Sequence, residues 1–260
     1  MKNYKVVIII LAALLALESI FLAYLLLRRP KKAAPPVVAP AVRARIAIVL
    51  DDWGYNTRNF TILDNIKYPV TFAVLPNLRY STLASQELSR RGFEIILHLP
   101  MEPREEFRLE KGTIMTRLDE GQIKNIIGAD LKSIAAVKGV SNHMGSRATE
   151  DPRVMRIIFQ ELNKRHLYFL DSVVSGSSVC EELAREARIG FAARDVFLDN
   201  EEDPAYIRGQ INQLKNKAKI HGYAVGIGHD RKNTLEILKE VMPQLAKEGY
   251  RFVFLSEVVR

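Results

Sequence analysis

The sequence predicts an α/β fold: an irregular (β/α) barrel of seven or eight parallel strands, preceded by one transmembrane helix. Short apolar runs alternate with longer amphipathic stretches from Ile46 to the end of the 260-residue chain. Strands that are apolar throughout and alternate with helices are typical of a parallel sheet covered on both faces. A single longer apolar run, residues 6–27, precedes this pattern. A doubly wound open sheet is the alternative arrangement for the same elements.

The apolar run at residues 6–27 contains one charged residue, Glu18. At about 1.5 Å per residue, a helix of this length spans roughly 33 Å, enough for the hydrocarbon core of a bilayer. Signal peptides have a shorter apolar run and a small-residue cleavage site. We therefore interpret residues 1–29 as an uncleaved membrane anchor, with a cleaved signal as the alternative. Basic residues flank both ends of the run, so charge alone leaves the orientation open.

Residues 30–44 are rich in proline and alanine and are predicted to form a stiff linker to a single domain, residues 45–260. The net charge of +8 is concentrated before this domain, because residues 1–45 hold eight basic residues and one acidic residue. Basic residues beside an anchor favour contact with anionic lipid headgroups. The charge pattern thus argues against a nucleic-acid partner. The single cysteine, Cys180, excludes an internal disulfide framework.

Eight strands and four long helices follow from the pattern of the domain. Pro152 and Pro204 each follow an aspartate, which is typical of a helix cap with proline at the first helical position. The expected helices are 121–137, 152–165, 204–220 and 234–248. The expected strands are Ile46–Leu50, Val70–Leu75, Glu94–Leu97, Gly139–Asn142, Leu167–Leu170, Phe197–Leu198, Tyr223–Ile227 and Phe252–Leu255.

Acidic and imidazole side chains gather at the carboxyl ends of these strands, whereas His166 and His221 precede strands. The strand-end residues are Asp51, Asp52, His98, Asn142, His143, Asp171, Asp199 and His229. Because α/β folds place their sites at this rim, we expect the side chains to converge. One carboxylate with two imidazoles is a common ligand set for catalytic zinc. The rim therefore predicts a hydrolase with a bound divalent metal ion, with zinc as the expected metal.

Three of these strand ends resemble motifs of the polysaccharide deacetylases. The sequence Ile-Val-Leu-Asp51-Asp52 resembles their first motif, in which the first aspartate is the base and the second binds metal. Arg-Gly-Phe-Glu-Ile-Ile-Leu-His98 resembles the approach to their metal-binding motif. The ordinary family has a second histidine four residues later, where this chain has Glu102. The segments HLPME, SNHMGSRAT and Gly-Ile-Gly-His229 are similar to the divergent branch of the family.

The resemblance covers roughly residues 45–260 and implies a distorted (β/α) barrel that removes N-acetyl groups from an amino-sugar polymer of the cell envelope. It implies that Asp51 is the base and that His229 is the general acid. Asp52 and His98 would bind the metal, and His143 is expected to complete the ligand set. An envelope polymer as substrate favours an extracytoplasmic position for the domain.

Other positions keep alternatives open. Glu102 is a weak ligand, a hydrogen-bond partner of a ligand histidine or a surface acid. Asp171 matches a late site aspartate of the family, although a strand-end aspartate also caps helices. Asn142, Ser146 and Arg147 are expected to hold substrate or to shape their loop. The two adjacent aspartates, Asp51 and Asp52, are expected to point in different directions.

Two other function classes compete with deacetylation. A non-catalytic glycan-binding or envelope-scaffolding protein would retain the fold without turnover, and the Glu102 departure favours it. A metal phosphoesterase is disfavoured, because Arg147 alone does not form a phosphate cradle.

Overall fold

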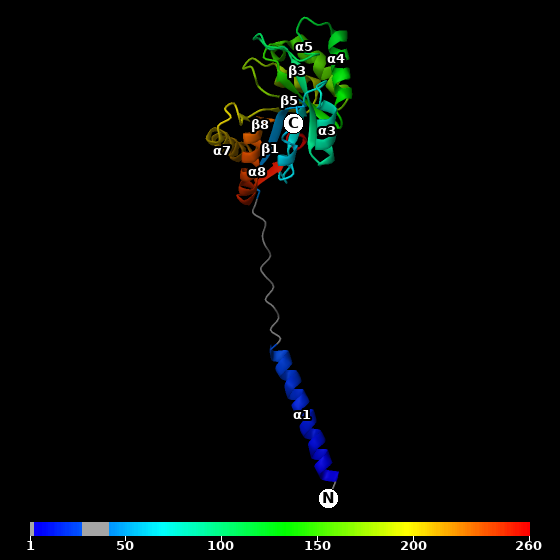
Figure 1. Ribbon diagram of the computed structural model, residues 1–260, viewed down its shortest axis with the longest axis vertical. Coiled ribbons are helices and arrows are strands. Elements are labelled where there is room, and N and C mark those ends of the chain that lie inside the picture. Colours follow the sequence, from blue (N-terminus) through cyan, green and yellow to red (C-terminus); the bar gives the residue numbers. More distant parts are fainter. Residues whose placement is uncertain (1–2, 28–41) are drawn as a thin grey trace. The chain divides into compact units, whose positions relative to one another are not determined.

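The computed structural model describes residues 3–27 and 42–260 (Figure 1). The predicted linker, residues 30–44, lies outside the described residues except for its last three. The chain divides into two units, residues 1–39 and 40–260, and each is described by itself.

The amino-terminal unit contains helix α1, Asn3–Leu27. Its segment Tyr4–Leu27 has a mean hydropathy of 2.8 and is long and apolar enough to cross a membrane. Large aliphatic side chains are exposed all around the helix, which is typical of a helix that contacts lipid. The predicted apolar helix of membrane-spanning length is therefore present. A membrane anchor and a signal sequence share this length and composition.

The second unit is built on one sheet of nine parallel strands that curls into a half-barrel. Its order is β6-β5-β4-β3-β2-β1-β8-β7, and β9 pairs with the start of β1. This nearly sequential order is that of a (β/α) barrel rather than of a doubly wound sheet. The strands are β1 Ala44–Trp53, β2 Thr71–Val74, β3 Glu94–Met101, β4 Val137–Met144, β5 Tyr168–Asp171, β6 Phe191–Ala193, β7 Val196–Phe197, β8 Tyr223–His229 and β9 Tyr250–Val253.

The predicted fold class is confirmed. The ninth strand arises because the stretch 191–197 forms two short strands: β6 pairs with β5, and β7 pairs with β8. The two edges of the half-barrel are thus joined by one continuous piece of chain. Seven helices cover the sheet: α2 Phe60–Leu63, α3 Ser81–Arg90, α4 Glu120–Ser133, α5 Pro152–Lys164, α6 Cys180–Ala187, α7 Pro204–His221 and α8 Lys232–Lys247.

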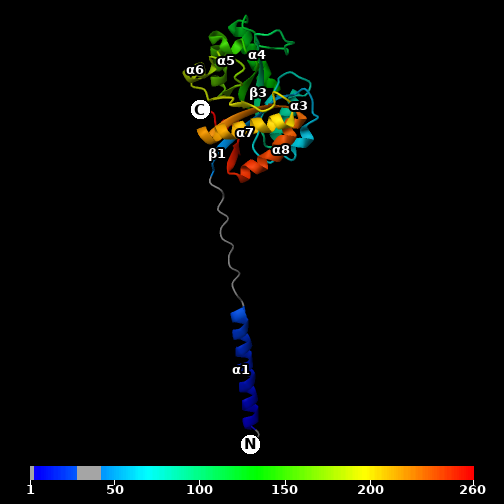
Figure 2. The same ribbon diagram turned by 90° about the vertical axis from the view of Figure 1, so that its left-hand side faces the viewer.

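The helices begin where their capping residues predict. Asp151 accepts hydrogen bonds from the backbone N–H groups of Arg153 and Val154, and Asp203 accepts one from Tyr206. Helices α7 and α8 pack against each other and over β8, β1 and β9 (Figure 2). The predicted helix 121–137 ends earlier, at Ser133, because strand β4 already begins at Val137.

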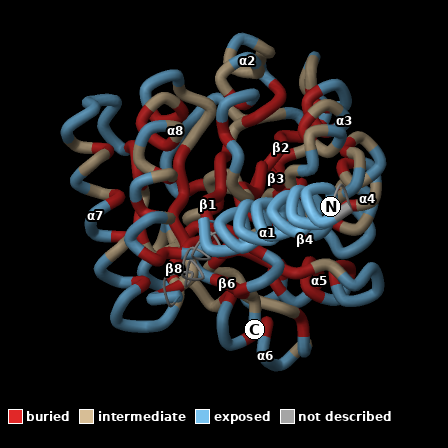
Figure 3. The backbone as a smooth tube through the Cα atoms, turned by 90° about the horizontal axis from the view of Figure 1, so that it is seen from below, coloured by how far each residue is buried: buried red, intermediate tan, exposed pale blue. Residues whose placement is uncertain are grey.

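Two hydrophobic layers hold the sheet in place. Along β1, Ile46, Ile48 and Leu50 face the helices, while Ala47 and Val49 face the interior of the half-barrel. This alternation follows from the twofold period of a strand. Figure 3 shows the buried strands in red, surrounded by helices whose outer faces are exposed.

A hydrogen-bonded carboxylate closes the amino-terminal end of the half-barrel. Glu94 Oε1 accepts hydrogen bonds from Tyr168 Oη (2.8 Å), Thr71 Oγ1 (2.9 Å) and the Ser256 backbone N–H (3.1 Å). Leu255 packs into the interior layer beside this group. Because the short 3₁₀ helix Leu255–Glu257 fills this end, the carboxyl ends of the strands remain as the place for a site.

Candidate metal centre

Both aspartates at the end of β1 reach the same histidine. Asp51 Oδ2 lies 3.6 Å and Asp52 Oδ1 3.4 Å from His98 Nε2. The pairing of β1 with β2 shifts register between Leu50 and Trp53, and Asp52 has a φ of 66°. Successive side chains of a regular strand point to opposite faces, and this irregularity turns Asp52 back toward Asp51. The expectation that the two acids point in different directions is therefore wrong.

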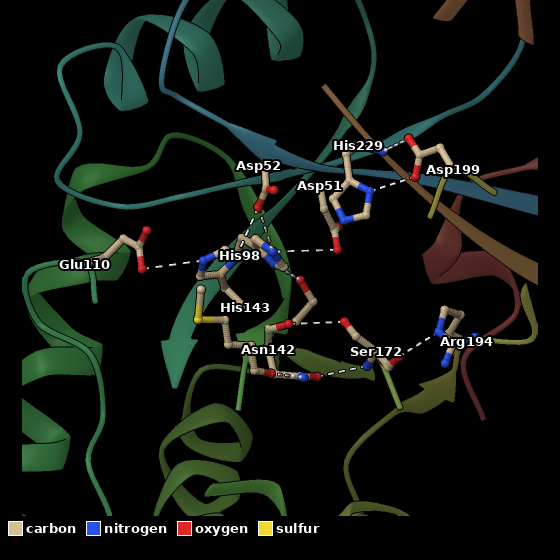
Figure 4. Close-up of polar contacts among 12 residues, drawn as sticks. Asp51, Asp52, His98, Glu110, Asn142, His143, Ser172, Arg194, Asp199 and His229 are labelled. Atoms are coloured by element: carbon tan, nitrogen blue, oxygen red, sulfur yellow. Dashed lines mark hydrogen bonds and ion pairs between the residues drawn. The ribbon is translucent and has the colours of Figure 1, made fainter. Parts of the chain in front are cut away.

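Two histidines come from the neighbouring strands β3 and β4. His98 is buried, and its Nδ1 lies 2.8 Å from Ser141 Oγ. His143 Nδ1 lies 3.1 Å from Asp52 Oδ1. The two rings are 4.9 Å apart at an interplanar angle of 70°. Figure 4 shows both imidazoles beneath the Asp52 carboxylate.

The donor atoms of Asp52, His98 and His143 fit a divalent ion. One ligand atom from each lies within 4.8 Å of the others. Asp52 Oδ1 is buried, and within residues 3–27 and 42–260 it has no hydrogen-bond partner, although two imidazole nitrogens are 3.1 and 3.4 Å away. A tetrahedral ion with bonds of about 2.0–2.1 Å separates its ligand atoms by about 3.3 Å. The distances between these three ligand atoms and the lack of a hydrogen bond to Asp52 Oδ1 are both typical of residues that bind one metal ion.

The two adjacent carboxylates differ in their acidity. Burial raises the pKa of Asp51, even though the nearby histidines oppose the change. Burial also acts to raise the pKa of Asp52, but the contacts with His143 and His98 outweigh it and hold this pKa well below its usual range. Environments that drive neighbouring pKa values apart are typical of sites with divided acid and base roles.

A third histidine faces the first strand from β8, where Asp51 and His229 are directly paired in register. His229 Nδ1 lies 2.7 Å from Asp199 Oδ1. The other oxygen of Asp199 accepts hydrogen bonds from the His229 backbone N–H (2.8 Å) and Thr234 Oγ1 (2.6 Å). Burial acts to lower the pKa of His229, but Asp199 outweighs it and raises this pKa. Asp199 thus fixes the ring and stabilises its charged form.

Asn142 and Asp171 form hydrogen bonds at the carboxyl ends of β4 and β5. Asn142 Nδ2 donates to the Met144 carbonyl (2.7 Å), and its Oδ1 accepts from the Ser172 N–H (2.9 Å), which ties the ends of β4 and β5 together. Asp171 accepts from the Val173 N–H (2.8 Å) and from Ser178 Oγ (2.6 Å). Both side chains therefore shape the strand ends.

Glu102, Ser146 and Arg147 lie around one loop, residues 102–118. Glu102 accepts hydrogen bonds from the Thr116 N–H and from Thr116 Oγ1 (2.7 Å), so its carboxylate contacts the loop. Ser146 Oγ accepts from the Arg104 N–H (2.9 Å). The exposed Arg147 guanidinium is 3.7 Å from Glu102.

That loop brings a residue to the site that sequence reasoning missed. Glu110 Oε2 lies 3.5 Å from His143 Nε2, and Glu110 Oε1 accepts a hydrogen bond from Tyr55 Oη (2.6 Å). Burial and the neighbouring Glu110 raise the pKa of Tyr55. Glu110 belongs to the charged stretch EPREEFRLEKG, which is typical of a solvated loop. No sequence pattern marks it out.

The curled parallel half-barrel carries an Asp-His-His cluster at its carboxyl rim, where α/β folds place their sites. The sequence model of the divergent polysaccharide deacetylases matches residues 48–259. The chain therefore belongs to the divergent polysaccharide deacetylase family, as its motifs predict.

Relatives in two bacteria share most of this domain. An uncharacterized protein of Haemophilus influenzae is 30% identical over 206 residues, which make up 79% of this chain and 74% of the relative. The uncharacterized protein YibQ of Escherichia coli K12 is 31% identical over 207 residues, 80% of this chain and 65% of YibQ. The chain thus spans about two thirds to three quarters of the length of these relatives.

Solved structures share the fold. The uncharacterized protein ATU2773 of Agrobacterium tumefaciens C58 has a TM-score of 0.80 at 22% identity, covering 85% of this chain and 92% of that one. The catalytic domain of a peptidoglycan N-acetylglucosamine deacetylase from Eubacterium rectale has a TM-score of 0.52 at 14% identity, covering 86% and 93%. A mutant of BA3943, described as a CE4 family pseudoenzyme, has a TM-score of 0.52 at 15% identity, covering 85% and 68%.

Proposed function

We propose that the domain is a metal-dependent hydrolase that removes N-acetyl groups from an amino-sugar polymer of the cell envelope. Family membership supports the reaction class. The observation that carries the proposal is the convergence of Asp52, His98 and His143, with a buried carboxylate oxygen whose neighbours stand at ligand spacing. Zinc is the expected ion, because it accepts this mixed oxygen and nitrogen set.

Asp51 serves as the base in this proposal. When bound, the ion would supply Lewis acidity to the acetamide carbonyl and to the attacking water. Asp51 is buried beside the three ligands, and its Oδ1 has no hydrogen-bond partner within the described part of the chain. This oxygen takes the proton from the attacking water.

His229 serves as the acid from the opposite side. Its Nδ1 is held by Asp199, so the other ring nitrogen, Nε2, carries the proton that the departing amine receives. Asp199 stabilises the charged ring and prevents its rotation, as a buried carboxylate does for a catalytic histidine in other hydrolases.

Helix α1 completes the proposal as an uncleaved membrane anchor. Its segment Tyr4–Leu27 is exposed and is long and apolar enough to cross a bilayer, which suits a segment surrounded by lipid. The proposed envelope polymer favours an extracytoplasmic position for the domain that this anchor holds.

The direct test combines metal analysis with acetate release from amino-sugar polymers, on the detergent-solubilised full chain. Wild type is expected to bind one divalent ion and to release acetate. Asp52→Asn should lose both properties, whereas Asp51→Asn should keep the ion and lose acetate release by at least about 10²-fold. His221→Gln, a histidine substitution at the far end of the sheet, serves as the matched control. Wild type without stoichiometric metal, or Asp52→Asn with undiminished hydrolysis, would contradict the proposal.

A non-catalytic glycan-binding or scaffolding protein is the second candidate. Glu102 favours it, because its carboxylate binds the Thr116 loop where the ordinary family has a ligand histidine. This function predicts that metal removal lowers stability while no polymer yields acetate. The same assay therefore separates the two candidates.

A further inference from the structure

The loop that carries Glu110 is pinned to the end of β3. The Glu102 N–H donates to the Ile114 carbonyl, and the Ile114 N–H donates to the Pro100 carbonyl, both at 2.9 Å. Met101 and Ile114 form a parallel bridge, and the Glu102 side chain holds Thr116. These contacts fix the base of the loop and thereby hold Glu110 in place at the rim.

Two buried polar atoms without hydrogen-bond partners face each other at this point. Glu110 Oε2 and His143 Nε2 are both buried, and neither has a hydrogen-bond partner among residues 3–27 and 42–260. They lie 3.5 Å apart, only a few tenths of an ångström beyond a hydrogen bond. Leaving both atoms unpaired would be costly, because each loses its hydration on burial. An imidazole N–H and a carboxylate oxygen are matched donor and acceptor.

The two histidines of the cluster present different nitrogens to it. His98 directs Nε2 toward the aspartates and Nδ1 toward Ser141 Oγ. His143 directs Nδ1 toward Asp52 and Nε2 toward Glu110. Each ring can donate a proton only from the nitrogen that faces away from an ion, so the outer partner decides the tautomer. His98 has a neutral hydroxyl as its outer partner, and His143 has a carboxylate.

We propose that Glu110 is a positioning residue that accepts the Nε2–H of His143 and thereby fixes the ring with Nδ1 free to bind the metal ion. Tyr55 holds the carboxylate in place through its hydroxyl. This inference rests on the proposed metal site. It assigns a role in metal affinity to a loop residue 33 positions before the ligand that it supports.

The test is zinc affinity of the detergent-solubilised full chain, measured by competition with a chromophoric chelator. Glu110→Ala should weaken zinc binding about 10- to 100-fold, the usual effect of losing the outer partner of a ligand histidine. Glu110→Gln keeps a neutral acceptor and should lose less than about 10-fold. Tyr55→Phe should weaken zinc binding less than Glu110→Gln does, because it removes only the hydrogen bond that holds the Glu110 carboxylate. Glu106→Gln, an exposed glutamate of the same loop, should match wild type.

The outcomes separate this inference from the metal site itself. Zinc binding by wild type together with unchanged affinity in Glu110→Ala would overturn the inference and leave the metal site standing. Equal losses in Glu110→Gln and Glu110→Ala, accompanied by a lower melting temperature of the metal-free protein, would indicate a merely structural residue and would also overturn it. No zinc binding by wild type would overturn both proposals.

Discussion

The two ends of the half-barrel bury carboxylates in opposite ways. At the amino-terminal end, Glu94 Oε1 accepts three hydrogen bonds from protein donors. At the carboxyl rim, Asp51 Oδ1, Asp52 Oδ1 and Glu110 Oε2 are buried without a hydrogen-bond partner in the described ranges. A satisfied buried carboxylate stabilises the fold, whereas unsatisfied ones raise its free energy unless a ligand pairs with them. The comparison separates an end built for stability from an end built for binding.

Left-handed backbone occurs at both ends of the half-barrel, because Ala136 and His166 precede β4 and β5 with φ angles of 56° and 55°. Asp52, Met144 and Val173 follow or end β1, β4 and β5 with φ angles of 66°, 53° and 50°. Such conformations cost about 1–3 kcal/mol each, and most for a β-branched residue such as Val173. Strained backbone is therefore shared by the two ends and does not distinguish them.

The largest effect on the rim side is expected for Asp199→Asn. The substitution retains the shape of the side chain but removes the charge that holds the His229 ring, so hydrolysis should fall by about 10²- to 10⁴-fold. Metal content should stay close to that of wild type, because no contact found among the described residues joins Asp199 to Asp52, His98 or His143. Asp203→Asn, a matched change at the cap of α7, should leave turnover intact. An Asp199→Asn protein with wild-type turnover would show that His229 is not the acid.

The matching substitution at the opposite end is Glu94→Ala. It removes the acceptor of Tyr168 Oη, Thr71 Oγ1 and the Ser256 N–H, and it should lower the free energy of unfolding by about 2–4 kcal/mol. Zinc affinity at a temperature where the variant is folded should be unchanged. Urea unfolding together with the chelator assay measures both quantities. If Glu94→Ala weakened zinc binding as strongly as a rim substitution does, the claim that one end stabilises the fold and the other binds a ligand would be wrong.

The smallest effect concerns Asp130 on α4, a buried carboxylate that belongs to neither end. Burial raises its pKa to about 6, although a hydrogen bond from Asn77 opposes the change. The folded state thus holds this proton more tightly than the unfolded state, with its ordinary pKa of 3.8, so stability falls as pH rises from about 4 to about 6 and stays lower above that. Asp130→Asn should therefore stabilise the protein at pH 7.5 by about 1–2 kcal/mol after solvent screening.

At pH 3.5 the same substitution should have little effect, because the aspartate is then mostly protonated in both states. Urea midpoints at the two pH values measure the difference, with the exposed Glu106→Gln as control. Equal stabilisation at both pH values would show that the charge of Asp130 is not the cause.

The convergence of the rim could be predicted because parallel strands end together. Once the strands were assigned correctly, the sequence placed four side chains at one edge of the sheet: Asp51, His98, His143 and His229. The capping aspartates predicted the starts of α5 and α7 equally well. Family motifs added the expected roles, which remain predictions for each residue.

The remaining features depend on contacts that no local pattern encodes. The turn of Asp52 toward Asp51 requires a left-handed backbone, and an Asp-Asp pair alone does not specify one. The position of Glu110 depends on the anchoring of its loop by Glu102 and Thr116, 14 residues apart in the chain. Loops lack the periodicity that reveals strands and helices. Long-range anchoring of this kind becomes visible only in the folded chain.

The most direct test of the central claim is an anomalous difference map from crystals of the domain grown with zinc. The account predicts one peak about 2.0–2.2 Å from Asp52 Oδ1, His98 Nε2 and His143 Nδ1. Zinc that binds elsewhere, or only two of these atoms within bonding distance of the peak, would contradict it.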